Sequence, residues 1–218
     1  MDPLRDLYAA KPAGYFANAR DAEVVPLLNR PADRALELGC GDGATLGRLQ
    51  ERGLVRWAAG IEIDAEAADR ARSRLDQVLV GNVEAIADEA FPVDLDLILC
   101  LDVLEHLVDP WAVVRRLSRC LRPGGVLISC IPNIRHVGTL MPLLLKGRFD
   151  YADAGTLDRG HLRFFTRATI RELFEQAGLR VARIDAPVMG KSALLNTLTL
   201  GLARDLCAYR YLVRAEAR

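Results

Sequence analysis

The chain has 218 residues, of which 51% are hydrophobic, and its 29 lysines and arginines balance 29 aspartates and glutamates. This length suffices for one domain with a large core, so we expect a single domain over residues 1–218. A net charge of zero excludes an overall field that would steer the protein toward nucleic acid or an anionic membrane. We expect no nucleic-acid partner, although a local basic patch is compatible with this balance.

The cysteines and the apolar stretches limit the class of protein further. No two cysteines have the Cys-x-x-Cys spacing of a zinc site or redox dithiol, so we expect no metal and reduced, buried thiols. The cysteines are Cys40, Cys100, Cys120, Cys130 and Cys207. The N-terminus lacks a hydrophobic signal region, and the apolar stretches near residues 139–145 and 193–202 are shorter than the roughly 20 residues of a membrane span. We expect a cytoplasmic protein without stable membrane insertion.

Strand and helix patterns alternate from residue 34 onward. Near-continuous apolar runs, such as residues 95–101, are typical of strands covered on both faces. The predicted strands are 34–38, 57–63, 77–81, 95–101, 126–131, 179–185 and 209–216. The predicted helices are 44–52, 65–75, 84–89, 110–121 and 167–177, with an amphipathic segment near 191–206 and a turn at Pro123-Gly124-Gly125. This alternation predicts an α/β fold with a doubly wound, mostly parallel sheet of seven strands.

Two segments fall outside this alternation. Residues 133–165 follow the fifth strand and have no clean period, so we expect an irregular insertion that binds the substrate. Residues 1–30 predict one or two helices that act as a lid, in which Tyr8, Tyr15 and Phe16 either exclude water from a ligand or pack on the sheet.

Side chains in the second half of the chain leave alternatives open. The insertion holds more cations than acids, which suits a phosphate group of a nucleotide-linked sugar or lipid-linked glycan, or a solvated loop with internal ion pairs. The cations are Arg135, Lys146, Arg148, Arg159 and Arg163. Leucines at 194, 195, 198, 200 and 202 have helical spacing. They predict core or a homodimer face, with a membrane-surface role as the alternative.

The glycine-rich turn after the first predicted strand has two interpretations. Gly39-x-Gly41-x-x-Ala44 fits a relaxed dinucleotide fingerprint, and Glu62 lies about 20 residues on, where an acid holds ribose hydroxyls. However, Glu37 stands two residues before the first glycine. A carboxylate there would repel a pyrophosphate and suits a ligand that brings a positive charge.

Residues 36–43, Leu-Glu-Leu-Gly-Cys-Gly-Asp-Gly, resemble the first motif of the class I S-adenosylmethionine-dependent methyltransferases. Residues 61–64 are similar to the acidic motif of that family's second strand, and residues 81–84 to its adenine loop. Residues 101–110 resemble its segment after the fourth strand, and residues 121–125 the turn before its fifth strand. The resemblance runs in order from about residue 33 to the C-terminus.

This resemblance implies a Rossmann-like methyltransferase fold and S-adenosyl-L-methionine as cofactor. Glu37 and the glycine loop would surround its methionine part, Glu62 would bind the ribose hydroxyls, and Asn82, where the family often has aspartate, would lie along the adenine. The cofactor-binding residues implied are Glu37, Gly39, Cys40, Gly41, Gly43, Glu62, Ile63, Asn82, Val83, Leu101, Asp102 and His106. Residues 147–151 and 157–166 resemble a bacterial subgroup often encountered with glycosyltransferases and polysaccharide assembly.

Three histidines are candidates for a general base. His106, His136 and His161 follow predicted strands four and five or lie in the insertion, on the side of an open α/β sheet where ligands bind. A hydroxyl nucleophile benefits from a base with a pKa near neutrality, which imidazole provides. The structural alternative is that His106 lines the cofactor pocket and His161 anchors the insertion.

These features predict an S-adenosylmethionine-dependent methyltransferase that acts on a hydroxyl of a small molecule or glycan. The alternatives are an NAD(P)-dependent oxidoreductase, against which Glu37 argues, and a non-catalytic protein that binds S-adenosylmethionine. Sugar, phenol, quinone precursor and carboxylate all remain open as the acceptor.

Overall fold

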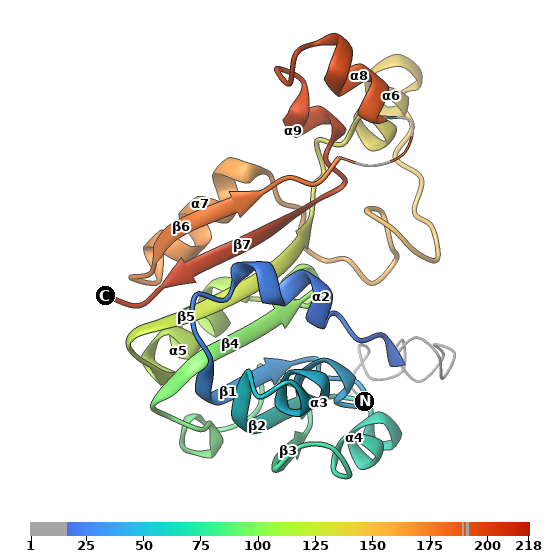
Figure 1. The fold of residues 1–218 in the computed structure, drawn as a ribbon. Helices are drawn as coiled ribbons and strands as arrows, with labels where there is room; N and C mark the ends of the chain where they lie inside the picture. The colour runs from blue at the N-terminus through green and yellow to red at the C-terminus, as the bar shows by residue number, and fades with distance from the viewer. Residues whose placement is uncertain (1–16, 189, 191) are drawn as a thin grey trace.

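The structure, a computed structural model, describes residues 17–188, 190 and 192–218. Its strands form one seven-stranded sheet in the order β3-β2-β1-β4-β5-β7-β6 (Figure 1). The strands are β1 Ala32–Leu38, β2 Val55–Glu62, β3 Gln77–Val80, β4 Leu95–Leu101, β5 Leu121–Pro132, β6 Arg180–Asp185 and β7 Arg210–Glu216. Strands β1 to β5 pair in parallel, whereas β7 is antiparallel to both β5 and β6. The predicted doubly wound, mostly parallel sheet is confirmed.

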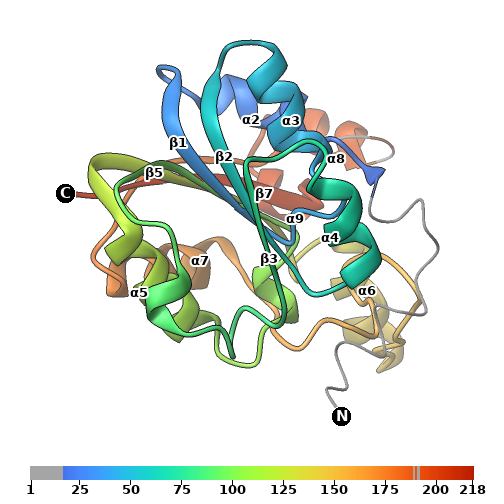
Figure 2. The ribbon, with the colours of Figure 1, turned by 90° about the horizontal axis from the view of Figure 1, so that it is seen from below.

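Helices cover both faces of the sheet, with α2, α3 and α4 on one side and α5 and α7 on the other (Figure 2). Alternate residues of β4 face opposite cores: Leu97 and Leu99 pack with α3 and its neighbours, whereas Ile98 and Cys100 pack with α5 and α7. The helices that match predictions are α3 Ala44–Glu51, α4 Ala65–Ala71, α5 Pro110–Cys120 and α7 Arg167–Gln176. Burial on both faces explains why the strand sequences are apolar throughout.

Side-chain caps fix where three of these helices begin. Asp64 accepts a hydrogen bond from the Ala67 N–H before α4, and Asp109 accepts one from the Ala112 N–H before α5. Thr166, the predicted cap of α7, forms a capping box with Thr169. These caps satisfy backbone donors that a helix N-terminus otherwise leaves unpaired.

Two predicted local structures are wrong. Pro123-Gly124-Gly125 is not a separate turn, because β5 already begins at Leu121 and pairs with β4 through a register irregularity. Gly124 has a φ of +74°, and a Cβ on Gly125 would lie 2.7 Å from the Leu95 carbonyl oxygen, so both glycines serve this irregular pairing. The predicted helix at 84–89 is a turn followed by the 3-10 helix η3, Asp88–Ala90.

The segments outside the alternation also differ from expectation. The insertion contains an ordered helix, α6 Val137–Lys146, before an irregular stretch. The segment 191–206 holds two short helices, α8 Ser192–Leu198 and α9 Arg204–Cys207, and its leucines 194, 198, 200 and 202 are exposed, so they do not form core. In the predicted N-terminal lid, α2 Asp21–Val24 and the 3-10 helix η2 Val25–Leu27 are helical, whereas Tyr8, Tyr15 and Phe16 lie outside the described residues.

Candidate active site

A cleft of about 510 Å³ opens at the carboxyl ends of β1, β2 and β4. The sheet order places β1 between β2 and β4, so the chain leaves β1 at the point where the strand order reverses, which is where open α/β sheets bind ligands. Of the twelve predicted cofactor-binding residues, eleven line this cleft: Glu37, Gly39, Cys40, Gly41, Glu62, Ile63, Asn82, Val83, Leu101, Asp102 and His106. Gly43 does not line it.

The glycine turn brings the backbone to the floor of the cleft. Gly39, Gly41 and Gly43 have φ values of +62°, +55° and +78°, a region that side chains with a Cβ rarely adopt. A Cβ on Gly39 would lie 2.7 Å from the Val103 side chain, and one on Gly43 would lie 3.0 Å from Leu75. Gly39 and Gly41 thus shape the cleft, whereas Gly43 lets α3 begin close to the loop that follows α4.

Glu37 lies near the end of β1 with its side chain buried, and its Oε2 has no hydrogen-bond partner among the described residues. Burial raises the pKa of this carboxyl to about 8, although hydrogen bonds from Thr45 and from the Leu46 N–H oppose the rise. A cation placed against Oε2 would restore the ionised form. The amino group of a methionine moiety therefore fits this position.

Glu62, at the end of β2, holds the glycine turn in place. Its Oε2 accepts the Gly41 N–H at 2.8 Å, and its Oε1 accepts the N–H groups of Ile63 and Asp64 at 2.9 and 3.0 Å. Burial raises the pKa of this carboxyl, and the three backbone donors counteract that rise. The carboxylate is thus fixed at the edge of the cleft, with lone pairs left for the two hydroxyls of a ribose.

Asn82 follows β3 and lines the same cleft between Gly81 and Val83. Its side-chain oxygen accepts the Glu84 N–H at 3.0 Å, which stabilises the turn after the strand. The turn thus holds Asn82 and Val83 at the wall of the cleft.

Charged groups from distant segments also line the cleft, and of these the sequence predicted Asp102 but not Arg20, Glu23 or Arg210. Asp102 has a φ of +57°, and its carboxylate pairs with Arg20 of the N-terminal segment. Arg20 also donates to Glu23 at 2.7 Å, and Glu23 pairs with Arg210 of β7 at 3.1 Å. These contacts join three segments far apart in the chain, so no motif in the sequence indicates them.

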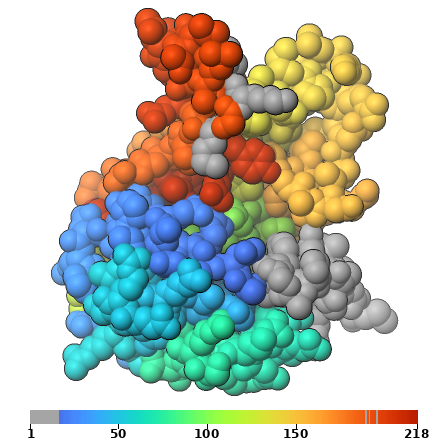
Figure 3. Space-filling model, turned by 45° about the vertical axis from the view of Figure 1, so that its right-hand side comes forward, coloured from blue at the N-terminus to red at the C-terminus, as the bar shows by residue number. Residues whose placement is uncertain are grey.

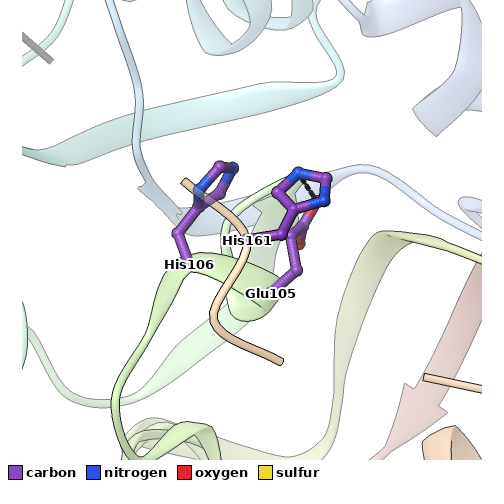
Figure 4. Close-up of side chains that lie close together, drawn as sticks. All are labelled: Glu105, His106 and His161. Carbon is purple, nitrogen blue, oxygen red and sulfur yellow. Dashed lines mark ion pairs between the residues drawn. The ribbon is translucent and has the colours of Figure 1, made fainter. Parts of the chain in front are cut away.

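Two of the three predicted histidines lie together beside the cleft (Figure 4). The rings of His106 and His161 meet edge to face with centroids 4.6 Å apart, and both are buried. His106 Nδ1 lies 2.9 Å from the carbonyl oxygen of Gly160, and His161 Nδ1 lies 2.9 Å from that of Thr156. Because a carbonyl only accepts, each Nδ1 carries the hydrogen. Burial and the neighbouring His161 lower the pKa of His106 to about 4, so its ring is neutral at pH 7.

Glu105 stands against the two rings, which sequence reasoning did not anticipate. It is 1% exposed, neither carboxylate oxygen has a hydrogen-bond partner among the described residues, and burial raises its pKa well above the usual range. Its Oε1 lies 3.9 Å from His161 Nε2, and the donor atoms of Glu105, His106 and His161 all come within 4.8 Å of one another. Such a cluster can share a proton and is also the donor set that could surround a small cation.

His136 is separate from this cluster. Its Nδ1 accepts the Gly138 N–H at the start of α6, its ring stacks edge to face on Tyr209, and it does not line the cleft. The structure thus brings His106 and His161 together and leaves His136 as a helix cap. No helix within residues 17–188 and 192–218 is long and apolar enough to cross a bilayer.

The sheet order, the glycine turn and the two acids at the ends of β1 and β2 define a methyltransferase of the seven-stranded α/β class. Comparison with known proteins places the chain more narrowly: residues 13–184 match the family described as "Methyltransferase domain", and the chain belongs to this family. It is an S-adenosylmethionine-dependent methyltransferase, and not the nicotinamide-dependent oxidoreductase that the glycine turn also allowed.

Relatives in this family act on different acceptors. The chain is 33% identical over 174 residues to the ubiquinone biosynthesis O-methyltransferase of Pseudomonas fluorescens (strain SBW25), covering 72% of this chain and 68% of that one. It is 36% identical over 129 residues to the tRNA 5-carboxymethoxyuridine methyltransferase of Escherichia coli (strain K12), covering 56% and 48%. Magnesium protoporphyrin IX methyltransferase from Synechocystis, solved with bound SAH, superposes with a TM-score of 0.62 at 16% identity, covering 94% and 83%. That likeness concerns the fold alone.

Proposed function

We propose that this methyltransferase methylates a hydroxyl oxygen of a small molecule or glycan, with the acceptor bound beside His106. The observation that carries the proposal is a neutral, buried imidazole in the wall of the cleft, whose Nδ1 hydrogen is held by the Gly160 carbonyl. This fixes the tautomer in which Nε2 accepts a proton. The similarity to a ubiquinone biosynthesis O-methyltransferase supports an oxygen acceptor. The similarity to a tRNA methyltransferase does not bear on a small-molecule acceptor, because that relative acts on tRNA.

The residues around the cleft suit the methyl donor in three places. Glu37 would face the positively charged methionine part, Glu62 the ribose hydroxyls, and Asn82 the adenine. When bound, S-adenosylmethionine supplies a methyl group on a positively charged sulfur, which is the electrophile. The protein contributes positioning, because transfer needs the acceptor oxygen, the methyl carbon and the sulfur in line.

His106 would take the proton of the acceptor hydroxyl as the new bond forms. As the methyl group passes from the cofactor to the acceptor oxygen, the hydroxyl proton would pass to His106 Nε2. A pKa of about 4 makes the isolated imidazole a weak base, so the transfer would depend on an ionised Glu105 beside the ring to stabilise the charge that develops on it. Glu105 and His161 are therefore positioning residues in this proposal, and no bound metal is required.

The proposal is tested with S-adenosylmethionine that carries a labelled methyl group and a panel of acceptors. The panel should contain a catechol, a sugar, a carboxylate and an amine, and mass spectrometry should locate the transferred group. We expect methylation of a hydroxyl, unchanged by a chelator such as EDTA. Transfer to nitrogen or to a carboxylate alone, or loss of activity with EDTA, would overturn it.

A further inference from the structure

Two apolar lobes project beyond the carboxyl end of β5, where β7 begins (Figures 1 and 3). One lobe is α6 and the other comprises α8 and α9. Together they carry half of the sixteen large hydrophobic side chains that are exposed among the described residues. The eight are Met141, Leu143, Leu144, Leu145, Leu194, Leu198, Leu200 and Leu202.

These side chains protrude into solvent and do not line a groove. Leu200 and Leu202 are 93% and 92% exposed, and Leu200 has a φ of +51°, which a leucine rarely adopts. Residues of this kind normally contribute to a core, and single exposed leucines need no explanation. Eight of them on two lobes require an explanation, because exposed apolar side chains that gather on one part of a protein mark an interaction site.

The same segments carry more basic than acidic side chains. Residues 133–149 and 186–204 contain no aspartate or glutamate, and the acid of α9, Asp205, pairs with Arg167 outside the lobes. Their cations are Arg135, Lys146, Arg148, Lys191 and Arg204. Among the described residues, Arg148 pairs with Asp150, whereas Lys146 and Arg204 have no carboxylate partner. Protruding leucines accompanied by an excess of basic groups are typical of segments that bind the surface of an anionic bilayer.

We propose that α6, α8 and α9 bind the surface of an anionic phospholipid membrane. The leucines enter the region between headgroups and acyl chains, while Lys146 and Arg204 contact phosphate groups. Phe149 and Tyr151, which stack edge to face beside α6 with centroids 5.6 Å apart, are suited to the headgroup level. A second copy of this chain fits less well, because two basic surfaces would then face each other.

Attachment in this way would orient the active site. α6 follows β5 directly, and α9 is followed by β7, whose first residue, Arg210, lines the cleft. A membrane held by the lobes therefore lies near the side where the acceptor is proposed to enter. Membrane binding itself does not rest on the proposed function, whereas this consequence does: it favours an amphiphilic acceptor that reaches the cleft from the bilayer.

The test is cosedimentation of the full chain with vesicles of phosphatidylcholine alone and with 30% phosphatidylglycerol. The variant carries Leu144→Ser, Leu145→Ser, Leu198→Ser and Leu200→Ser, and the matched control carries Val93→Ser and Val108→Ser at two other exposed apolar positions. We expect the wild type and the control to bind the anionic vesicles, and the leucine variant to bind at least about tenfold more weakly. Lys146→Gln should weaken binding about fivefold.

S-adenosylhomocysteine binding, measured on every variant, reports the fold and the cofactor cleft separately. Equal vesicle binding by the leucine variant and the wild type, or no preference for phosphatidylglycerol, would overturn the proposal. Sedimentation velocity provides the other decisive outcome: a wild-type dimer that the leucine variant converts to a monomer would assign the lobes to contact between two copies.

Discussion

The edge of the sheet at the carboxyl ends of its strands has two parts, which differ in structure. Around β1, β2 and β4, the cleft is shaped by glycines with positive φ and by buried carboxylates whose positions the strand register fixes. Beyond β5, the chain forms short helices and irregular loops with protruding leucines and cations. We expect the sequence of the first part to be tightly constrained, because it must bind the methyl donor. We expect the sequence of the second part to vary with the acceptor. The predictions below test this division, beginning with the largest expected effect.

Glu37→Gln should weaken binding of S-adenosylhomocysteine about a hundredfold, because the amide cannot supply the charge that a buried ammonium group needs. Isothermal calorimetry measures the affinity. Asp33→Asn, an exposed acid on the same strand, is the matched control and should leave the affinity unchanged. Equal affinity in the Glu37 variant would remove this residue from the cofactor site.

His106→Ala should lower kcat about a hundredfold, the usual cost of losing a general base. His136→Ala should have no effect, because that histidine only caps α6. Rates are measured with saturating S-adenosylmethionine, so that a change in cofactor affinity does not contribute. If both variants retain the wild-type kcat, positioning alone accounts for the transfer.

The ligand-free protein should lose stability as the pH rises from about 5 to 8. The folded pKa of Glu37 is raised to about 8 from an ordinary value near 4.5, so the folded state holds a proton that the unfolded state releases first. At about 1.4 kcal/mol for each unit of pKa difference, the loss between pH 5 and pH 8 should amount to roughly 3–4 kcal/mol.

Urea unfolding at several pH values measures this loss, and Glu37→Gln should reduce the dependence, leaving the part that comes from the raised pKa values of Glu62 and Glu105. Because the Glu37 carboxyl is protonated in the ligand-free protein at pH 7, binding of a cationic ligand should release a proton from it. Calorimetry in two buffers of different ionisation enthalpy detects this release. Uptake of protons on binding would contradict the assignment.

Gly39→Ala should produce the smallest effect, a destabilisation of about 1–2 kcal/mol, because the substituted residue must keep a positive φ. The new methyl group would also displace the Val103 side chain, which a Cβ at Gly39 would approach within 2.7 Å. Gly53→Ala, which also has a positive φ but meets nothing within 4 Å, separates backbone strain from this contact. Thermal unfolding with and without S-adenosylhomocysteine compares the two.

The sequence predicted the first part well and the second part poorly, for physical reasons. Strands buried on both faces have long apolar runs, and a turn that requires positive φ requires glycine. The strands β1 and β4 and the Gly39–Gly43 turn can therefore be predicted from short stretches of sequence. The pairing of Arg20 with Asp102 and the approach of Glu105 to His161 depend on segments brought together only by the fold. The same holds for the exposed leucines, whose spacing is that of a helix whether it is buried or not.

The insertion is fastened at its two ends. The Ile134 N–H binds the Phe165 carbonyl at 3.1 Å, and the N–H groups of Leu162 and Arg163 both bind the Glu105 carbonyl at 2.8 and 2.9 Å. The part of the excursion between residues 135 and 155, which precedes the carbonyls that hold the two histidine rings, can therefore lengthen, shorten or change sequence with little effect on the cleft, because loop closure costs little more as a loop grows. With this arrangement, the site of the methyl donor can stay the same while the acceptor site changes. One fold can thus acquire new substrates in small evolutionary steps.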